Sequence, residues 1–539
     1  MFKSVLLTSM AKVLPDTNIS TLYSTDTFSG LKGEKVCFQI SVCCDEDKTV
    51  KFNINDKSDL KVYLVDYTPA TLAVHEDADD YYISKESGLY PDVLKEMNDC
   101  TIELNADKPA SLYFEYSATY AVEKDITVTF SQNNETLSDL TAKIVIADCQ
   151  LPEQDIICTH WFHTDCLCDW YGFLPFSDEY WLTVENYAKN AVEHGINSLL
   201  VPLFTPALDT EIGTERMTVQ LVDVNVDSDG NYSFSFDNLI KWISLFKKCG
   251  IKGFEFSHFF TQWGALHAPK IMATVNGEYK RIFGWETDST GEEYVRFLTA
   301  FSSAVKPVLK ECDIENCSYF HVSDEPNDEQ IEQYKKCSDI VTKLFGEYKI
   351  IDALSSFEFY KRGIVKNPVV CIHDAEPFLD VVDNLWVYYC CWPVNNYYTN
   401  RFFAMPSQRT RILGMQMYKY NMKGFLHWGY NFWYSQLSKE KVNPYQVSDG
   451  GNAFTAGDPF VVYPGENYMP VNSLRLKIFR DAFQDISALN ALESLVGREK
   501  VMYILEKEGE LTLNKYPRSE QWHFEKRHEI NMAIKEITG

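Results

Sequence analysis

The sequence predicts an α/β protein, in which a (β/α)8 barrel of the triosephosphate isomerase type follows an N-terminal β-sandwich. Three observations carry this prediction. The first 150 residues alternate apolar and polar side chains with period two, and from about residue 155 apolar strands alternate with capped amphipathic helices. The segment DCQLPEQD around Pro152 separates the two patterns. We therefore expect a β-sandwich over 1–152, a catalytic barrel over 153–495 and a helical tail over 496–539.

The β pattern of the first domain is clearest in residues 36–42 and 126–130, where every second side chain is apolar. Such alternation is typical of strands that bury one face. Several strands of this kind with few helical stretches favour a sandwich of two sheets.

Eight strands can be assigned in the second domain. A helix capped by Ser177 and ending at Gly195 follows the first, and a helix from Asp237 to Gly250 follows the second. Further helices are expected near 291–311, 328–345, 407–421, 472–494 and 520–537, whereas the connection between strands five and six is short of helix. The eight strands are Ile156 to Phe162, SLLVPLF, GFEFSHF, SYFHVSDEP, YKIIDAL, NPVVCIHD, LWVYYCCWP and KGFLHWGYNFW.

Composition restricts the partners of the protein. The formal net charge is -27, which disfavours nucleic acid and an anionic membrane surface as partners. No apolar run approaches the length of a membrane span, and the first residues make a poor signal peptide. The 15 cysteines are odd in number and include the adjacent pairs Cys43-Cys44 and Cys390-Cys391, which predicts free thiols and a cytoplasmic location.

Asp324 and Glu325 are the first candidates for catalysis, because they end the fourth strand of the barrel, where such barrels carry their active sites. A turn there lets both carboxyl groups reach one pocket. One can then stay protonated as a general acid while the other stays ionised. The alternative is that Asp324-Glu325-Pro326 only caps the next helix.

The first strand carries a dense group of polar side chains in His160-Trp-Phe-His163-Thr-Asp165. These could ligate zinc, but their spacing fits no standard zinc motif, and we expect no metal. We expect His163 and Asp165 to bind substrate hydroxyl groups or to form a buried pair. No glycine-rich phosphate loop and no nucleophile elbow is present, so no cofactor is expected.

Three further strand ends carry tryptophans, and a barrel mouth lined by several aromatic faces suits a sugar ring. Each tryptophan taken alone is more simply explained as part of the core. The residues that we expect to bind substrate, besides His163 and Asp165, are His258, Trp263, Asp352, Tyr389, Trp392, Trp428 and Asn431.

The ordered motifs HVSDEP, GFLHWGYNFW, GDPFVVYPG and SLRLKIFRDAFQD resemble glycoside hydrolase family 123 and the domain-of-unknown-function family 4091, and GEKVCFQIS and GLYPDVL resemble the domain that precedes the barrel there. The resemblance implies a retaining β-N-acetylgalactosaminidase that works by substrate assistance, in which the 2-acetamido oxygen attacks the anomeric carbon. It implies that Asp324 orients and charges the acetamide and that Glu325 is the acid and then the base. A tyrosine, Tyr389 or Tyr388, is expected to hold the acetamide.

Other functions stay open at this point. Glu325 could work with Glu255 or Asp352 in a different glycosidase, the barrel could bind carbohydrate without turnover, or His160, His163 and Asp165 could form a metal-dependent hydrolase. In the favoured reading the partner is an oligosaccharide or glycoconjugate substrate, and the sequence leaves open whether the chain forms a homo-oligomer.

Overall fold

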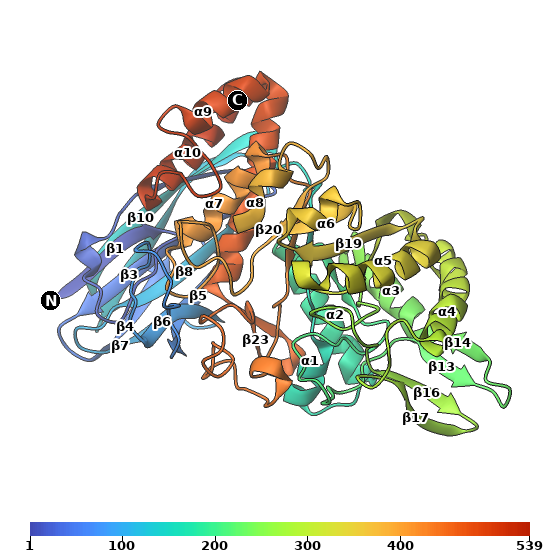
Figure 1. Cartoon of the computed structure of the whole chain (residues 1–539). Coiled ribbons are helices and arrows are strands. Elements are labelled where there is room, and N and C mark those ends of the chain that lie inside the picture. Colours follow the sequence, from blue (N-terminus) through green and yellow to red (C-terminus); the bar gives the residue numbers. More distant parts are fainter.

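The computed structural model describes residues 1–539 and contains a closed barrel of eight parallel strands (Figure 1). The order around the barrel follows the chain, and the last strand pairs with the first to close it. All eight predicted barrel strands are present, although each is shorter than its apolar run. They are β11 (Ile157–His160), β12 (Ser198–Val201), β15 (Gly253–Phe256), β18 (Ser318–Phe320), β19 (Lys349–Leu354), β20 (Asn367–Cys371), β21 (Trp386–Tyr388) and β22 (Gly424–His427).

Helices connect the strands where the sequence predicts them. Ser177 caps α2 (Asp178–Glu193) by accepting from Tyr180 N, and α3 (Asp237–Cys249) ends at Gly250 with φ +96°, which suits a residue without a Cβ. After β19 there is only α6 (Phe357–Lys361), and after β20 only two short 3-10 turns. The other predicted helices of this part are α4 (Glu292–Glu311), α5 (Ile331–Phe345), α7 (Ser407–Lys419) and α8 (Leu474–Val496), whereas α1 (Thr164–Tyr171) was not predicted.

Two small sheets were not predicted. Strands β13 (Asp223–Val226), β14 (Tyr232–Ser235), β16 (Ile271–Val275) and β17 (Glu278–Phe283) form one sheet from the connections that follow β12 and β15, at the lower right of Figure 1. A hairpin of β23 (Val462–Pro464) and β24 (Pro470–Asn472) precedes α8. These insertions lengthen the loops at the end of the barrel where the candidate residues lie.

The N-terminal part consists of two five-stranded sheets. One has the order β1-β3-β8-β5-β6 and the other β2-β10-β9-β4-β7, in which only β2 and β10 are parallel. Side chains from both sheets share a cluster of 22 buried residues, and Phe28 of one sheet stacks on Phe38 of the other at 5.1 Å. The assignment of these two sheets to a β-sandwich fold stays a prediction. The strands are β1 (Phe2–Thr8), β2 (Thr27–Lys32), β3 (Lys35–Cys44), β4 (Lys48–Ile54), β5 (Leu60–Ala70), β6 (Gly88–Glu96), β7 (Thr101–Leu104), β8 (Ala110–Ser117), β9 (Val122–Gln132) and β10 (Glu135–Gln150).

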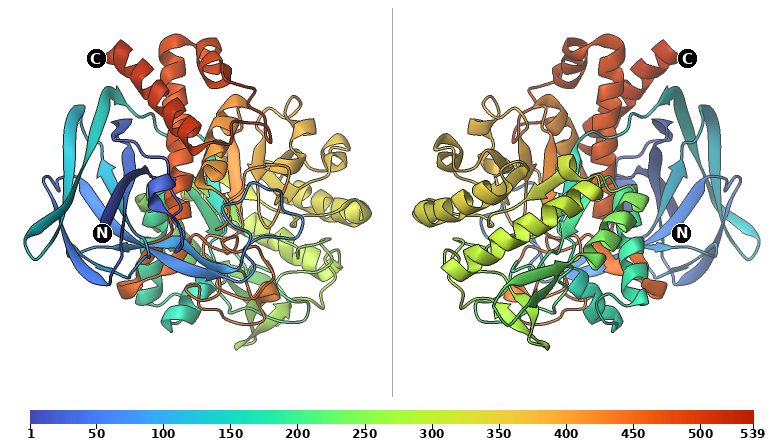
Figure 2. Two further views of the ribbon diagram at one scale, coloured as in Figure 1. Left: turned by 90° about the vertical axis from the view of Figure 1, so that its left-hand side faces the viewer. Right: turned by 90° about the vertical axis from the view of Figure 1, so that its right-hand side faces the viewer.

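Helix α8 joins the two parts, and Figures 1 and 2 show it between the N-terminal sheets and the barrel. On the sheet side its buried cations meet buried acids: Arg475 binds both oxygens of Asp92 in β6 (2.8 and 3.0 Å), and Lys477 and Arg480 bind Glu115 in β8 (2.8 and 2.5 Å). Buried charges need such partners, because an unpaired buried charge loses its hydration and gains no attraction to an opposite charge in exchange. On the barrel side α7 crosses α8 so closely that a Cβ on Gly414 would lie 2.1 Å from the Ala482 carbonyl oxygen.

The C-terminal segment contains α9 (Arg498–Glu506), which was not predicted, and α10 (Glu520–Thr538), which was. Helix α10 lies against β2, β10 and α8, where Arg527 binds Glu34 at 2.7 Å and Asp485 at 2.9 Å. The predicted domain boundaries stay predictions, and α8 runs through the one at 495. All 15 cysteines are free. None of the helices is both long and apolar enough to cross a membrane.

Candidate active site

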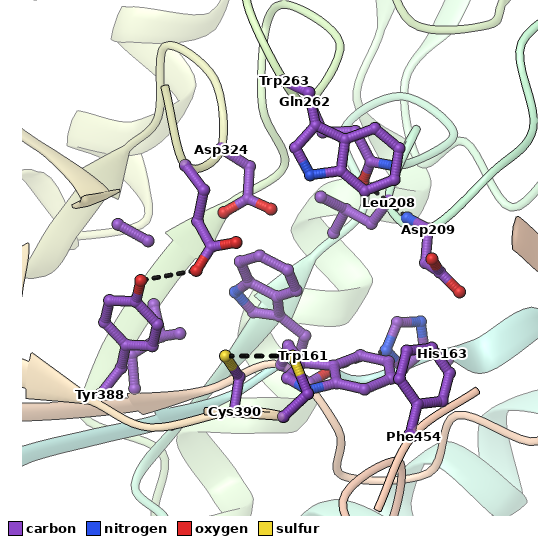
Figure 3. A pocket seen from close by; sticks show the side chains of 15 residues that line it. Trp161, His163, Leu208, Asp209, Gln262, Trp263, Asp324, Tyr388, Cys390 and Phe454 are labelled. Atoms are coloured by element: carbon purple, nitrogen blue, oxygen red, sulfur yellow. Dashed lines mark hydrogen bonds between the residues drawn. The ribbon is translucent and has the colours of Figure 1, made fainter. Parts of the chain in front are cut away.

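A cavity opens at the C-terminal end of the barrel strands, with an empty volume of about 670 Å³ that includes its open mouth. Its walls come from the segments that follow β11, β12, β15 and β18 and from the ends of β21 and β22. Figure 3 shows Asp324 and Tyr388 toward one end and Asp209, His163 and Phe454 toward the other. This is the end of a parallel barrel at which enzymes of this architecture build their active sites.

Asp324 and Glu325 both line the cavity, and the backbone around them is held firmly. Trp263 N donates to the Asp324 carbonyl (3.1 Å), and Glu325 N donates to the Ala353 carbonyl (3.2 Å). Glu325 has φ +43°, a left-handed conformation that a residue with a long side chain adopts at a cost of about 1–3 kcal/mol. Neighbouring positions in a regular strand face opposite sides, so this strained turn is what lets two adjacent carboxyl groups serve one cavity.

The two tyrosines considered for the site differ completely in position. Tyr388, the last residue of β21, lines the cavity, and its hydroxyl donates to Glu325 Oε1 at 2.5 Å, the contact marked by a dashed line in Figure 3. Tyr389 points away from the cavity. Its ring packs edge-on against Phe425 and His427, and its buried hydroxyl has no partner. The expectation that Tyr389 binds substrate is therefore wrong for its position, and of the two tyrosines only Tyr388 lines the cavity.

Both carboxyl groups of the pair are harder to ionise than usual. Burial raises the pKa of Asp324 well above its ordinary range, and the charge of Glu325 adds to this effect. Solvent reaches Glu325 through the mouth of the cavity, yet the enclosing protein still raises the pKa of its carboxyl, while the Tyr388 hydrogen bond lowers it. The pair therefore titrates as a unit that retains one proton between the two steps.

The hydrogen bonds indicate which of the two carries that proton. Asp324 is 8% exposed and its carboxyl group accepts no hydrogen bond from the protein, whereas Glu325 accepts one from Tyr388. A hydrogen bond to the ionised form favours that form, so in the free protein the proton favours Asp324.

A buried ionic network lies beneath the pair. His321 donates from Nε2 to Glu255 Oε1 (2.7 Å) and from Nδ1 to Asp352 Oδ1 (3.1 Å). Burial lowers the pKa of His321, but its two carboxylate partners outweigh burial and raise that pKa to about 9. His321 is thus an imidazolium at neutral pH. Trp161 Nε1 also donates to Glu255 (2.8 Å), and the Tyr334 hydroxyl donates to Asp352.

Glu255 and Asp352 do not line the cavity, which bears on the second glycosidase hypothesis. Both carboxylates are occupied by His321 and by neutral donors, so neither is free to act on a substrate with Glu325. The His258 and His321 nitrogens and an Asp352 oxygen lie within 4.8 Å of one another, a spacing that could hold a metal ion. Because both His321 nitrogens already donate to carboxylates, the cluster fits a protonated histidine better than a metal ligand.

Aromatic side chains form the walls. Trp161, Trp263, Trp428 and Phe454 line the cavity, and Trp263 is 45% exposed. Trp428 is oriented by its indole N–H, which donates to Asp458 Oδ2 at 3.0 Å. Trp392 does not line the cavity; its ring packs near the rings of His75 and His373. Two of the three tryptophans expected at the mouth therefore face it.

The polar group after β11 is organised by an arginine from a distant loop. Arg216 binds both oxygens of Asp165 (2.7 Å each) and donates to His163 Nδ1 (3.1 Å), while His163 Nε2 donates to the Trp428 carbonyl (2.9 Å). His163 lines the cavity, but both of its nitrogens are engaged, and Asp165 is buried in the ion pair. His160 accepts from Arg401 instead (3.0 Å). With guanidinium groups on these side chains, the hypothesis of a zinc site there is not supported.

Four other expected binding residues also lie outside the cavity. His258 is buried against His321 and Trp161, with ring centroids 4.2 and 5.3 Å away. Asn431 holds the His163 backbone through its side-chain amide (2.9 and 3.0 Å). Four side chains that were expected to contact substrate therefore lie behind the cavity wall and contact other residues of the protein. They are His258, Asp352, Asn431 and Asp165.

Several lining residues were not singled out from the sequence. They are Trp161, Leu208, Asp209, Gln262, Cys390, Cys391 and Phe454, besides Ala353 and Leu426. Trp161 follows His160 at the end of the first barrel strand, so an aromatic side chain at the barrel mouth could have been predicted there. Asp209 and Gln262 lie well beyond the ends of β12 and β15 in long loops, where no sequence pattern indicates which side chain returns to the mouth.

A pair of carboxyl groups between aromatic walls, at the mouth of a parallel barrel, fits a carbohydrate-cleaving enzyme of the glycoside hydrolase class. The family follows from comparison: residues 161–492 match the model of the glycoside hydrolase 123 catalytic domain, and the chain belongs to glycoside hydrolase family 123. This confirms the family resemblance of the motifs.

One solved structure has the same fold as this chain. A family 123 glycoside hydrolase from Clostridium perfringens is similar over 100% of this chain and 98% of its own, with 14% identity and a TM-score of 0.75. A family 39 glycoside hydrolase from Bacteroides cellulosilyticus WH2 covers 86% of this chain and 81% of its own at 12% identity, with a TM-score of only 0.34. The sequence matches none of the curated proteins with which it was compared.

Proposed function

We propose that the protein is a retaining glycoside hydrolase that removes a terminal β-linked N-acetylhexosamine, N-acetylgalactosamine in the first instance, by substrate-assisted catalysis. The observation that carries the proposal is the adjacent pair Asp324-Glu325, facing one cavity in a chain of family 123. A carboxylate nucleophile normally stands about 5–5.5 Å from the acid across the scissile bond. Adjacent residues suit a mechanism in which the nucleophile belongs to the substrate.

In this mechanism the acetamide oxygen attacks C1 while the glycosidic bond breaks and the leaving oxygen takes a proton. Glu325 donates that proton, and Asp324 accepts a hydrogen bond from the acetamide N–H and stabilises the positive charge of the forming oxazolinium. Glu325 then takes a proton from water as the water opens the oxazolinium at C1. Retention of configuration results from the two inversions.

Substrate binding has to move the shared proton. In the free protein it favours Asp324, but the arriving acetamide N–H donates to that carboxyl group and so favours its ionised form. The proton then belongs to Glu325, next to the leaving oxygen. Binding of the acetamide thus leaves Glu325 protonated, which is the form that acts as the acid. The mechanism therefore predicts a strict requirement for the 2-acetamido group of the substrate.

The substrate is proposed to be an oligosaccharide or glycoconjugate. The similar Clostridium perfringens enzyme is described in terms of glycolipid glycan hydrolysis. The volume of the cavity suits one terminal sugar with part of the next, and the aromatic walls suit the C–H faces of a pyranose.

The test compares 4-nitrophenyl and alkyl glycosides, each with and without the 2-acetamido group. Glu325→Gln should lose about 10²–10⁴-fold on the alkyl glycoside and much less on the nitrophenyl glycoside, whose leaving group needs no proton. Asp324→Asn should lose rate on both, since ring closure is impaired whatever leaves. Glu329→Gln, an exposed acid in the next turn, is the matched control and should keep wild-type rates.

A thiazoline analogue of the intermediate should also bind far more tightly than substrate. Equal hydrolysis with and without the acetamide would refute substrate assistance. Saturable sugar binding without turnover on any of these glycosides would favour the carbohydrate-binding alternative.

A further inference from the structure

We propose that Asp209 and Gln262 together recognise a hydroxyl group of the terminal sugar on the side of the ring opposite the scissile bond, at C4 or C6, and so determine which sugar the enzyme accepts. The proposal rests on the function proposed above for its orientation of the sugar. Neither residue has a part in the acid–base chemistry.

Asp209 is held in position by three hydrogen bonds. Its backbone N donates to Gln262 Oε1 (2.6 Å), its carbonyl accepts from Ser438 Oγ (2.6 Å), and its Oδ2 accepts from Leu437 N (2.9 Å). Its φ of +41° is left-handed, a conformation that the surrounding contacts must maintain. Oδ1 has no protein partner, and the side chain lines the cavity.

Gln262 supplies the complementary group. It is 7% exposed, and its Oε1 is taken by Asp209 N, which fixes the orientation of the amide. Its Nε2 is buried without a hydrogen-bond partner although the residue lines the cavity. A buried donor without an acceptor is costly, and such groups in native proteins usually have a partner that binds to them.

A sugar hydroxyl fits this pair because it accepts and donates at once. Gln262 Nε2 can donate to the hydroxyl oxygen while the hydroxyl donates to Asp209 Oδ1. A site built around such a hydrogen bond discriminates strongly against ligands that lack the hydroxyl, since its own buried groups are then left unpaired.

The position along the cavity determines which hydroxyls are reached. Figure 3 places Asp209 at the opposite end of the cavity from Tyr388, with Trp263 on one side and His163 on the other. Under the proposed function the Asp324–Glu325 end holds C1 and the C2 acetamide. C4 lies across a pyranose ring from C1, and the hydroxymethyl group on C5 lies next to it, so the C4 and C6 hydroxyls meet Asp209 and Gln262. The C4 hydroxyl is axial in galactose-type sugars and equatorial in glucose-type sugars, which makes this the end that distinguishes the two.

The test is a double-mutant cycle between protein and substrate. We would measure kcat/KM of the wild type and Asp209→Ala on a 4-nitrophenyl β-N-acetylgalactosaminide and on its 4-deoxy and 6-deoxy forms. Asp209→Ala should lose about 10- to 1000-fold on the parent sugar and little on the deoxy form that lacks the recognised hydroxyl. Gln262→Glu, which keeps the acceptor for Asp209 N but removes the donor, should lose activity on the parent sugar in the same selective way.

Glu211→Gln is the control, because it removes the same charge from the same loop outside the cavity. Thermal unfolding of each variant establishes that it is folded. An equal loss on the parent and on both deoxy sugars would overturn the inference. All three substrates of the cycle keep the acetamide, so the cycle does not test substrate assistance. If sugars without the acetamide are hydrolysed equally, substrate assistance is refuted, and the same cycle on those sugars still tests the role of Asp209.

Discussion

The hydroxyl of Tyr388 donates a 2.5 Å hydrogen bond to Oε1 of Glu325. Tyr388 ends β21 and Glu325 follows β18, and these two strands are not neighbours in the barrel. The contact spans the cavity wall between the ends of β18 and β21. The hydrogen bond holds the side chain of Glu325, whose backbone is strained, and it stabilises the ionised form of the Glu325 carboxyl group.

Tyr388→Phe should shift the basic limb of the pH profile of kcat/KM to higher pH. Glu325 must be protonated to act as the acid, so activity falls as pH rises through the pKa of the pair. Removing a hydrogen bond that favours the ionised form raises that pKa and extends activity upward. The maximum rate should fall as well, because the acid is less well positioned.

Tyr389→Phe is the matched control for this experiment. It removes a hydroxyl one residue away that has no partner and does not reach the cavity, so its profile should coincide with that of the wild type. An unchanged basic limb in Tyr388→Phe would contradict the assignment of Glu325 as the acid.

His321 should make the protein less stable as the solution becomes alkaline. Its pKa of about 9 in the folded protein exceeds the ordinary value of 6.5, so the stabilisation is complete below about pH 6.5 and is lost as pH rises through 9. The difference corresponds to roughly 3 kcal/mol of unfolding free energy at most. Urea unfolding at several pH values should show His321→Gln costing more at pH 6.5 than at pH 9, while His75→Gln on the surface keeps the wild-type slope.

Removing the guanidinium of Arg216 should destabilise the mouth of the barrel. Asp165 is buried, and its carboxylate receives both of its strong hydrogen bonds from Arg216. Arg216→Met should therefore cost about 3–5 kcal/mol of unfolding free energy. The double variant Arg216→Met with Asp165→Asn should recover part of that loss, because no charge is left unpaired; additive losses would show that the ion pair is not the cause.

Arg527 should stabilise the contact between α10 and the N-terminal sheets more than it stabilises the barrel. Arg527→Met leaves Glu34 buried without its cation, and burial alone already raises the pKa of Glu34. Hydrogen exchange should quicken in α10, β2 and β10 and stay unchanged in β15 and β18. Uniform acceleration over the whole chain would show that the helix is integral to a single cooperative unit.

The sequence predicted the barrel well because each strand is an apolar run bounded by caps and turns, as Ser177 and Gly250 illustrate. It predicted Asp324, Glu325, Trp263 and Trp428 at the mouth because strand ends of a barrel share one face. It failed for Asp209 and Gln262, whose loops are shaped by long-range contacts. It also predicted substrate contacts for polar residues that instead bind other residues of the protein. Asp165 binds Arg216 and Asp352 binds His321. These partners lie far away in sequence, so no local pattern indicates that the two carboxylates are buried and paired.

The docking of α10 has a consequence for the order in which the protein can be completed during synthesis. Thr8 of β1 donates to Glu520, and Glu34 pairs with Arg527, so these N-terminal sheets acquire both partners only after residues 520–527 have been synthesised. At about 5–20 residues per second, some five hundred residues take on the order of half a minute or longer. Through that interval the surface later covered by α10 is exposed on a nascent chain, and a polypeptide whose synthesis stops before residue 520 leaves Thr8 and Glu34 without these partners.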